Sequence, residues 1–80
     1  MEISVLFFGI TKDLVKSSQL QIEVVENSSV SNLKSVLKNT FPELENINSY
    51  AIAVNEAYAL DENILKEGDI VAIIPPVSGG

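Results

Sequence analysis

The sequence predicts an α+β fold, in which a small mixed β-sheet carries one main helix packed on one face. Three observations lead to this expectation. Runs of strand-forming residues lie near both ends of the 80-residue chain, one stripe of apolar residues at helical spacing lies between them, and Gly- or Asn-containing turns separate the runs. Hydrophobic residues make up 46% of the chain, which is enough to form a single buried core.

Two strands are expected in the first third of the chain. Glu2–Phe8 is rich in strand formers and stops at a glycine. Leu20–Val24 alternates apolar and polar residues, which is typical of a half-buried antiparallel strand. The segment between them, Thr11–Ser17, is short and mixed, and it can form a single helical turn with Leu14 and Val15 facing inward.

The main helix is expected to run from Val30 to about Asn39. Ser29 suits the N-cap position, because its hydroxyl can accept a hydrogen bond from an N–H of the first turn. The Phe41-Pro42 pair ends the helix, since the residue before a proline avoids helical backbone angles. The apolar positions recur along one face of this helix: Val30, Leu33, Val36 and Leu37.

Three further strands are expected in the last third, at Tyr50–Val54, Ala57–Ala59 and Ile70–Ile74. Asn55-Glu56 forms the turn between the first two, and Gly68 is expected to adopt a positive φ in the turn before the last. The order is therefore β-β-α-β-β-β, with one helix laid across a mixed sheet. That order is typical of the β-grasp, which is also the ubiquitin-like fold.

Side-chain alternation predicts which face of the sheet the helix covers. The face that carries Glu2 and Ser4 should point outward, and Phe8 shares its phase. Ile74 lies outward too, and Tyr58 belongs to a neighbouring strand, so we expect a partner to bind an apolar patch there, unless a loop such as 39–49 covers it. The helix should pack with Val30, Leu33 and Leu37 on Ile3, Val5, Phe7, Ile22, Val24, Val71 and Ile73.

Composition argues against several classes of function. The chain has no Cys and no His, which removes disulfides, thiol nucleophiles and the commonest metal ligand and general base, so we expect no metal site. Eleven acidic residues against five basic residues argue against nucleic-acid binding. The longest apolar runs have five residues, whereas a membrane span needs about 20. We expect a soluble, cytoplasmic protein with no membrane partner.

The sequence ends in Gly79-Gly80, after two prolines that stop the last strand. We therefore expect a β-grasp domain over residues 1–74 and a flexible tail over residues 75–80. Six extended residues span about 20 Å. Because its tip has no side chains, such a tail can enter a narrow tunnel and bring a terminal carboxylate to a buried atom. A frayed terminus is the alternative interpretation.

Three stretches carry a resemblance to a known family: Val5–Gly9, Ala53–Glu56 and Gly68–Gly80, the last of which contains Pro-Pro-Val-Ser-Gly-Gly. Over its whole length the chain resembles the small subunit of molybdopterin synthase, within the sulfur-carrier group of ubiquitin-like proteins. The double proline separates this family from the thiamine sulfur carriers, which usually lack it. The family often has Phe where this chain has Ile73 and Ile74.

The resemblance implies a carrier that holds no bound cofactor and has no catalytic residues of its own. An E1-like adenylyltransferase adenylates the Gly80 carboxylate with ATP, and sulfur then replaces AMP to leave a thiocarboxylate, or 1-thioglycine. The carrier forms a hetero-oligomer with the large synthase subunit, which transfers the sulfur to cyclic pyranopterin monophosphate, and two such transfers build the dithiolene. The tail that would enter the large subunit consists of Pro75, Pro76, Val77, Ser78, Gly79 and Gly80.

Other functions stay open at this point. A thiamine-pathway sulfur carrier shares the terminal chemistry and differs in its partner. A ubiquitin-like modifier would join Gly80 to lysines of other proteins, and isopeptide bonds in cells would reveal it. A β-grasp interaction domain with an inert tail would carry neither sulfur nor a conjugate.

Overall fold

The computed structural model describes residues 1–46 and 50–75, with only the backbone described at residues 45 and 46. It contains a five-stranded sheet in the order β2-β1-β5-β3-β4. The central pair, β1 and β5, is parallel, and every other neighbouring pair is antiparallel. The strands are β1 (Glu2–Phe7), β2 (Gln19–Glu23), β3 (Ala51–Val54), β4 (Ala57–Tyr58) and β5 (Ile70–Ile74).

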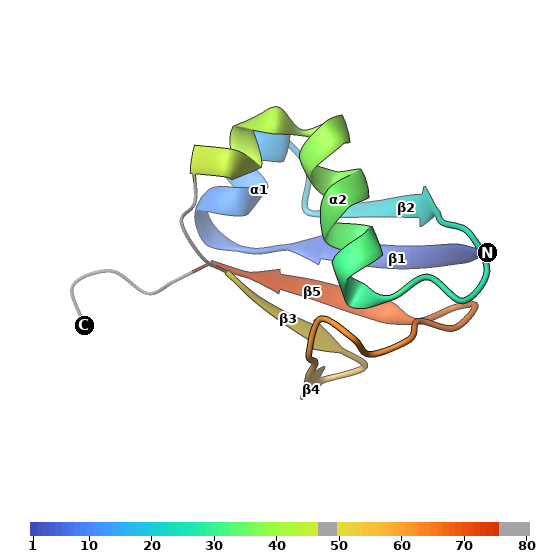
Figure 1. Ribbon diagram of the computed structural model, residues 1–80. Coiled ribbons are helices and arrows are strands. Elements are labelled where there is room, and N and C mark those ends of the chain that lie inside the picture. Colours follow the sequence, from blue (N-terminus) through green and yellow to red (C-terminus); the bar gives the residue numbers. More distant parts are fainter. Residues whose placement is uncertain (47–49, 76–80) are drawn as a thin grey trace.

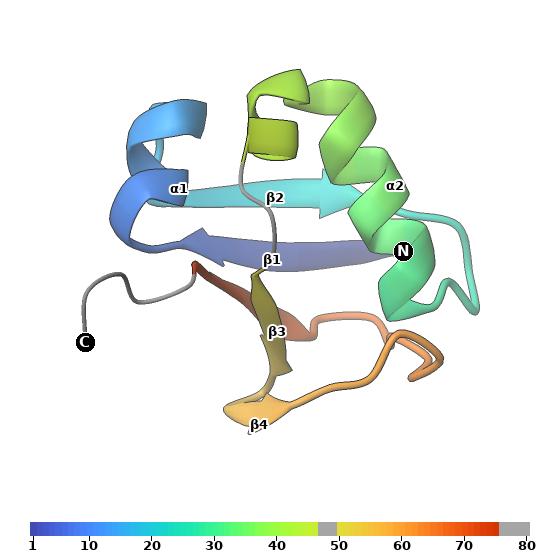
Figure 2. The ribbon, with the colours of Figure 1, turned by 60° about the vertical axis from the view of Figure 1, so that its left-hand side comes forward.

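The helices lie together on one face of this sheet (Figures 1 and 2). They are α1 (Gly9–Val15), α2 (Val30–Thr40) and a 3-10 turn over Pro42–Asn46. The predicted β-grasp is confirmed, with strand ends within one residue of those expected. The segment Thr11–Ser17 was expected to give one helical turn, and the structure has a longer helix there that begins earlier, at Gly9. No helix within the described residues is long and apolar enough to cross a membrane.

The start of α2 shows why this stretch of sequence becomes a helix. The Ser29 hydroxyl accepts a hydrogen bond from the N–H of Asn32 at 3.1 Å, as the predicted N-cap should. The two preceding N–H groups donate to the carbonyls of a loop from the other end of the chain: Val30 to Asn63 and Ser31 to Asp61, both at 2.9 Å. The first N–H groups of a helix have no acceptor within the helix, and here three of them donate to other groups of the protein.

The core lies between the helices and the inner face of the sheet. All ten residues predicted for it are buried except Ile22, which is half-buried. Leu44 and Leu65, which come from irregular or 3-10 segments, are also buried. Since Leu44 packs in this core beneath α1 and α2, the part of segment 39–49 that the structure describes lies on the helical side and not over the outer face.

Two turns at one end of the sheet follow the sequence closely. Gly68 adopts φ +82°, as expected for its turn. Asn55 and Glu56 both have positive φ, at 50° and 73°, which is the two-residue turn that suits a hairpin. The Asn55 side chain also accepts from the N–H of Ile70 and donates to Asp69, both at 3.0 Å. At Asn55, Glu56 and Gly68, the residues that carry the family resemblance therefore stabilise the fold.

Candidate functional site

The root of the predicted tail lies at the end of β5, where Pro75 follows Ile74. Pro75 is half-buried and packs against Gly9, the first residue of α1. A Cβ added at Gly9 would lie only 3.1 Å from Cγ of Pro75, and Gly9 has φ +56°. A side chain here would thus meet both the proline and an unfavourable backbone conformation. The remaining predicted tail residues lie outside the described residues: Pro76, Val77, Ser78, Gly79 and Gly80.

The strand register lines up apolar residues beside this root. On the sheet face away from the helices, Leu6 lies opposite Ala72, Ala72 opposite Ala53, and Ala53 opposite Tyr58. Three steps between neighbouring strands make this row about 15 Å long. Ile74 lies in the next position along β5 on the same face. We call the following six residues the tail-root patch: Leu6, Phe8, Ala53, Tyr58, Ala72 and Ile74.

The predicted interface residues are all at the surface in this patch. Phe8 is 49% exposed and Tyr58 is 78% exposed, while Ile74 is half-buried. The exposure of Phe8 agrees with the predicted phase, because its neighbour Phe7 is only 1% exposed. The exposure of Tyr58 excludes a place for it in the core. A role in binding a partner stays a prediction.

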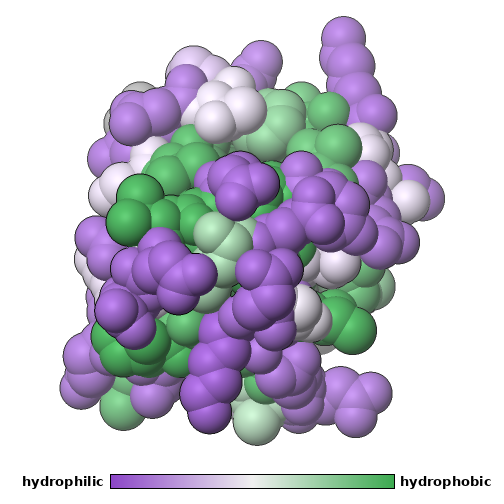
Figure 3. All heavy atoms as spheres, turned by 90° about the vertical axis from the view of Figure 1, so that its right-hand side faces the viewer, coloured by the Kyte–Doolittle hydropathy of each residue, from purple (hydrophilic) through white to green (hydrophobic). Residues whose placement is uncertain are grey.

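The charge pattern of the outer sheet face differs along the strands. None of the six residues of the tail-root patch is charged, although the chain has a formal net charge of −6. At the other end of the same face, Glu2 lies opposite Glu23 in the β1–β2 register. Viewed from the end where the N-terminus lies, hydrophilic side chains interrupt the apolar surface (Figure 3). The tail root is thus the end of the sheet that is suited to an apolar contact.

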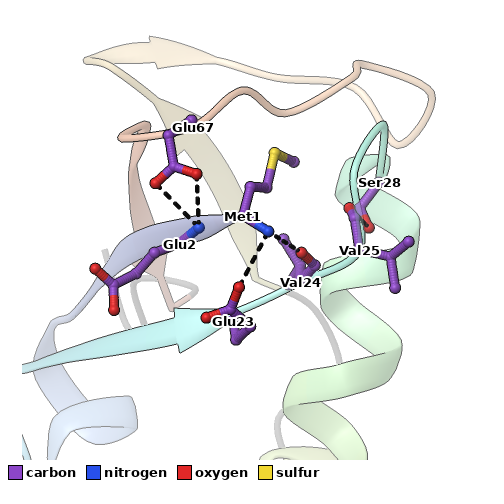
Figure 4. A network of polar contacts seen from close by, with 7 residues as sticks. All are labelled: Met1, Glu2, Glu23, Val24, Val25, Ser28 and Glu67. Carbon is purple, nitrogen blue, oxygen red and sulfur yellow. Dashed lines mark hydrogen bonds and ion pairs between the residues drawn. The ribbon is translucent and has the colours of Figure 1, made fainter.

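A network of polar contacts holds the end of the sheet opposite the tail root (Figure 4). The Met1 ammonium donates to the carbonyl of Val24 at 2.6 Å and lies 3.2 Å from the Glu23 carboxylate. The N–H of Glu2 donates to both carboxylate oxygens of Glu67, each at 3.2 Å. These contacts bind β1 to its neighbouring strand and to the turn before β5.

The described residues include no group of three or more acidic side chains that could hold a metal ion. The Lys34 ammonium is bound to Asp61 at 2.7 Å and lies 5.9 Å from the centre of the Tyr50 ring. Burial raises the pKa of Tyr50 above 10.0, and the nearby Lys34 ammonium partly opposes this rise. Tyr50 directly precedes Ala51, which pairs with Ile74, and the strand alternation places its side chain on the helical side of the sheet, the opposite face from the tail-root patch.

Sequence reasoning missed two features of this site. The small residues Ala53 and Ala72 form the middle of the patch, and only the register between three strands shows this. The contact between Gly9 and Pro75 joins segments far apart in sequence. The glycine itself was the available signal, since a glycine directly after a strand is often required by its backbone angles or by a close approach.

Comparison with known proteins gives three findings. The ThiS family model matches residues 5–80. The molybdopterin synthase sulfur carrier subunit of Arabidopsis thaliana is 36% identical over 81 residues, which cover 100% of this chain and 84% of that protein. A chain in the complex of subunits 1 and 2 of molybdopterin-converting factor from Helicobacter pylori is 30% identical with a TM-score of 0.71, and the match covers 100% of both chains.

The fold itself has a further match in an archaeal structure. SAMP1 from Haloferax volcanii aligns with a TM-score of 0.89 over 100% of both chains, at 21% identity. At this identity the match shows the β-grasp fold alone.

Proposed function

Because the chain belongs to the ThiS family, we propose that it is a sulfur carrier for molybdopterin synthase, which delivers sulfur in molybdenum cofactor biosynthesis as a thiocarboxylate on Gly80. The family match supports this function because it extends through Gly79 and Gly80. The structural observation that carries the proposal is the position of the tail root. The tail starts at the edge of an uncharged patch in which Phe8 and Tyr58 are exposed, so a partner that binds these two residues is also within reach of the tail.

The proposed chemistry takes place on the terminal carboxylate and needs no acid, base or metal ligand from this chain. An E1-like enzyme uses ATP to convert the Gly80 carboxylate into an acyl-adenylate, and pyrophosphate leaves. A sulfur nucleophile then displaces AMP, which leaves a thiocarboxylate. In the synthase the sulfur forms a bond to cyclic pyranopterin monophosphate, and hydrolysis of the acyl–sulfur bond returns Gly80 to a carboxylate. Two such transfers supply the dithiolene. Because the activation step requires ATP, a cytoplasmic location suits this chemistry.

The large subunit of the synthase is the proposed partner at the tail-root patch. The Helicobacter pylori relative is described in complex with a second subunit of the molybdopterin-converting factor, which supports a partner of this kind. Phe8 and Tyr58 would serve as aromatic anchors, since aromatic residues often dominate the affinity of an interface. From Pro75 onward six extended residues reach about 20 Å, which is enough to enter an active site next to the bound patch.

The test is an intact mass measurement followed by a transfer assay. The chain is co-expressed with the E1-like enzyme and a sulfur donor, and its mass should rise by the difference between sulfur and oxygen. The loaded carrier, mixed with the large subunit, should then convert the pterin precursor. Deletion of Gly80 is the matched control, and it should abolish both results while leaving the melting temperature unchanged.

Each alternative function predicts another result. A thiamine-pathway carrier would gain the sulfur but would not convert the pterin precursor with the large subunit. A protein modifier would appear in isopeptide bonds to lysines of other proteins. A chain that never gains sulfur, with Gly80 intact, would contradict the proposal.

A further inference from the structure

One buried side chain, Thr11, binds both polar backbone groups of the exposed Phe8. The N–H of Phe8 donates to Oγ1 of Thr11 at 3.1 Å, and the Thr11 hydroxyl donates to the Phe8 carbonyl at 2.5 Å. The backbone N–H of Thr11 donates to the same carbonyl at 3.2 Å. Since Thr11 is 0% exposed, solvent does not compete for its hydroxyl.

These bonds matter because Phe8 belongs to no regular element. β1 ends at Phe7 and α1 begins at Gly9, so Phe8 has no partner in the strand register and lies at the N-cap position of α1. Its backbone is extended, at φ −125° and ψ 154°. The contacts with Thr11 hold these angles, and the backbone angles decide in which direction the Phe8 ring leaves the chain.

The same turn also touches the tail root. Gly9 directly follows Phe8, and it is the residue against which Pro75 packs. The position of the Phe8 ring and the point where the tail leaves the sheet are therefore set within one turn, residues 8–11. A shift of this turn would move the ring relative to the tail.

Packing alone does not explain a hydroxyl at this position. Among the described residues, Thr11 and Ser28 are the two buried polar side chains. A valine has nearly the shape of a threonine and would fill the same space in an apolar core. What the threonine adds is the pair of bonds to the Phe8 backbone.

We propose that Thr11 is a positioning residue for partner binding, which holds Phe8 in the direction that the large subunit recognises. This inference rests on the proposed function, in which Phe8 is an anchor of the interface. Thr11 itself is buried and does not touch the partner. Its two side-chain hydrogen bonds both go to the Phe8 backbone, so we expect its effect on binding to depend on the Phe8 ring, and this dependence can be tested.

The experiment measures binding of the full chain to the large subunit by titration calorimetry. Thr11→Val removes the hydroxyl and should weaken binding by about five- to tenfold, which is the change in affinity expected if the free energy of one capping interaction must be restored on binding. Thr11→Ser keeps the hydroxyl and should bind within about twofold of the parent. In the sulfur-transfer assay, Thr11→Val should raise the KM for the carrier and leave kcat unchanged.

Ser28→Ala is the matched control. Ser28 is also buried, and its hydroxyl donates to the carbonyl of Val25 at 2.6 Å, but it lies near the N-terminal network, away from the patch. Its loss should lower the melting temperature without changing affinity. Equal losses of affinity in Ser28→Ala and Thr11→Val would show a general effect of stability and would overturn the proposal.

A double-mutant cycle separates this inference from the proposed function. Phe8→Ala should weaken binding, and adding Thr11→Val to it should cause no further loss, because the group that Thr11 positions is gone. If Phe8→Ala weakens binding and Thr11→Val does not, the positioning role is wrong and the interface stands. If Phe8→Ala binds as the parent does, the proposed interface is wrong. Thr11→Ala is a second variant without the hydroxyl. If Thr11→Val and Thr11→Ala both fail to fold, Thr11 serves stability and the proposal is rejected.

Discussion

At its first residues β1 is bound by polar contacts, whereas at its last residues it leads to an exposed aromatic side chain. The N–H of Glu2 is held by the Glu67 carboxylate, and the Met1 ammonium by the carbonyl of Val24. Past the other end, Phe8 is 49% exposed in an uncharged patch beside the tail root. The comparison teaches that the contacts made by charged groups and the candidate binding surface lie at opposite ends of a single strand.

The largest expected effect is a loss of stability on substitution of Phe7, the buried one of two adjacent phenylalanines. Phe7 is 1% exposed and meets Phe41 edge to face, with ring centroids 6.1 Å apart. Phe7→Ala should lower the free energy of unfolding by about 3–5 kcal/mol, because it leaves a large cavity in the core. Urea unfolding measures this loss. A loss below about 1 kcal/mol would mean that the core does not depend on this face of β1.

The adjacent residue should show the opposite response. Phe8→Glu should weaken binding to the large subunit by about thirtyfold or more, as expected for a hot spot. The free energy of unfolding should change by less than about 0.5 kcal/mol, because the ring already lies at the surface. Calorimetric titration and thermal melting measure the two quantities. Unfolding of this variant would instead show that Phe8 belongs to the core.

The polar end should affect stability without affecting binding. Glu67→Ala removes the acceptor of the Glu2 N–H and should lower the free energy of unfolding by about 1 kcal/mol. Its affinity for the large subunit should equal that of the parent. Glu62→Ala, which removes an exposed acid in another loop, is the control for the change in net charge. If Glu67→Ala loses affinity and Glu62→Ala does not, the two ends of β1 are not independent and the prediction is wrong.

A smaller effect is expected from Tyr50, which directly precedes β3. Burial raises its pKa above 10.0 in the folded protein, so the folded state keeps the phenol proton to a higher pH than the unfolded chain does. The resulting stability is complete below the ordinary pKa and is lost as the pH rises through the folded pKa. Tyr50→Phe should therefore flatten the fall in the free energy of unfolding above about pH 10. Unfolding curves of both proteins on either side of this pH provide the test, and equal slopes would contradict the prediction.

Much of the fold could be predicted from local patterns. The alternation in β2, the Ser29 cap and the apolar stripe of α2 each depend on residues close in sequence, and the structure has all three. The predicted start of the first helix, Thr11, was two residues too late. The helix is capped by the side chain of Thr11, at the third helical position, and its N-cap residue is not polar. A side chain that reaches back to the preceding residue leaves a weaker sequence signal.

The candidate site was less predictable, because it depends on register. The exposure of Phe8 followed from the phase of β1, but the alanines between it and Tyr58 come from two other strands. Leu65 is buried although it lies in a loop, and no periodicity marks it. A pattern within one segment cannot show which residues of distant segments become neighbours.

The parallel pairing of β1 and β5 has a consequence for how the chain folds. Ser4 pairs with Ile70, so the centre of the sheet closes a loop of more than 60 residues. Such non-local closure is slow compared with local helix formation, and β5 leaves the ribosome after every other strand. The tail root and the patch beside it therefore come together only when this pairing is complete. A partner that needs both would bind only the completely folded chain, because the candidate binding surface forms in the last step of sheet assembly.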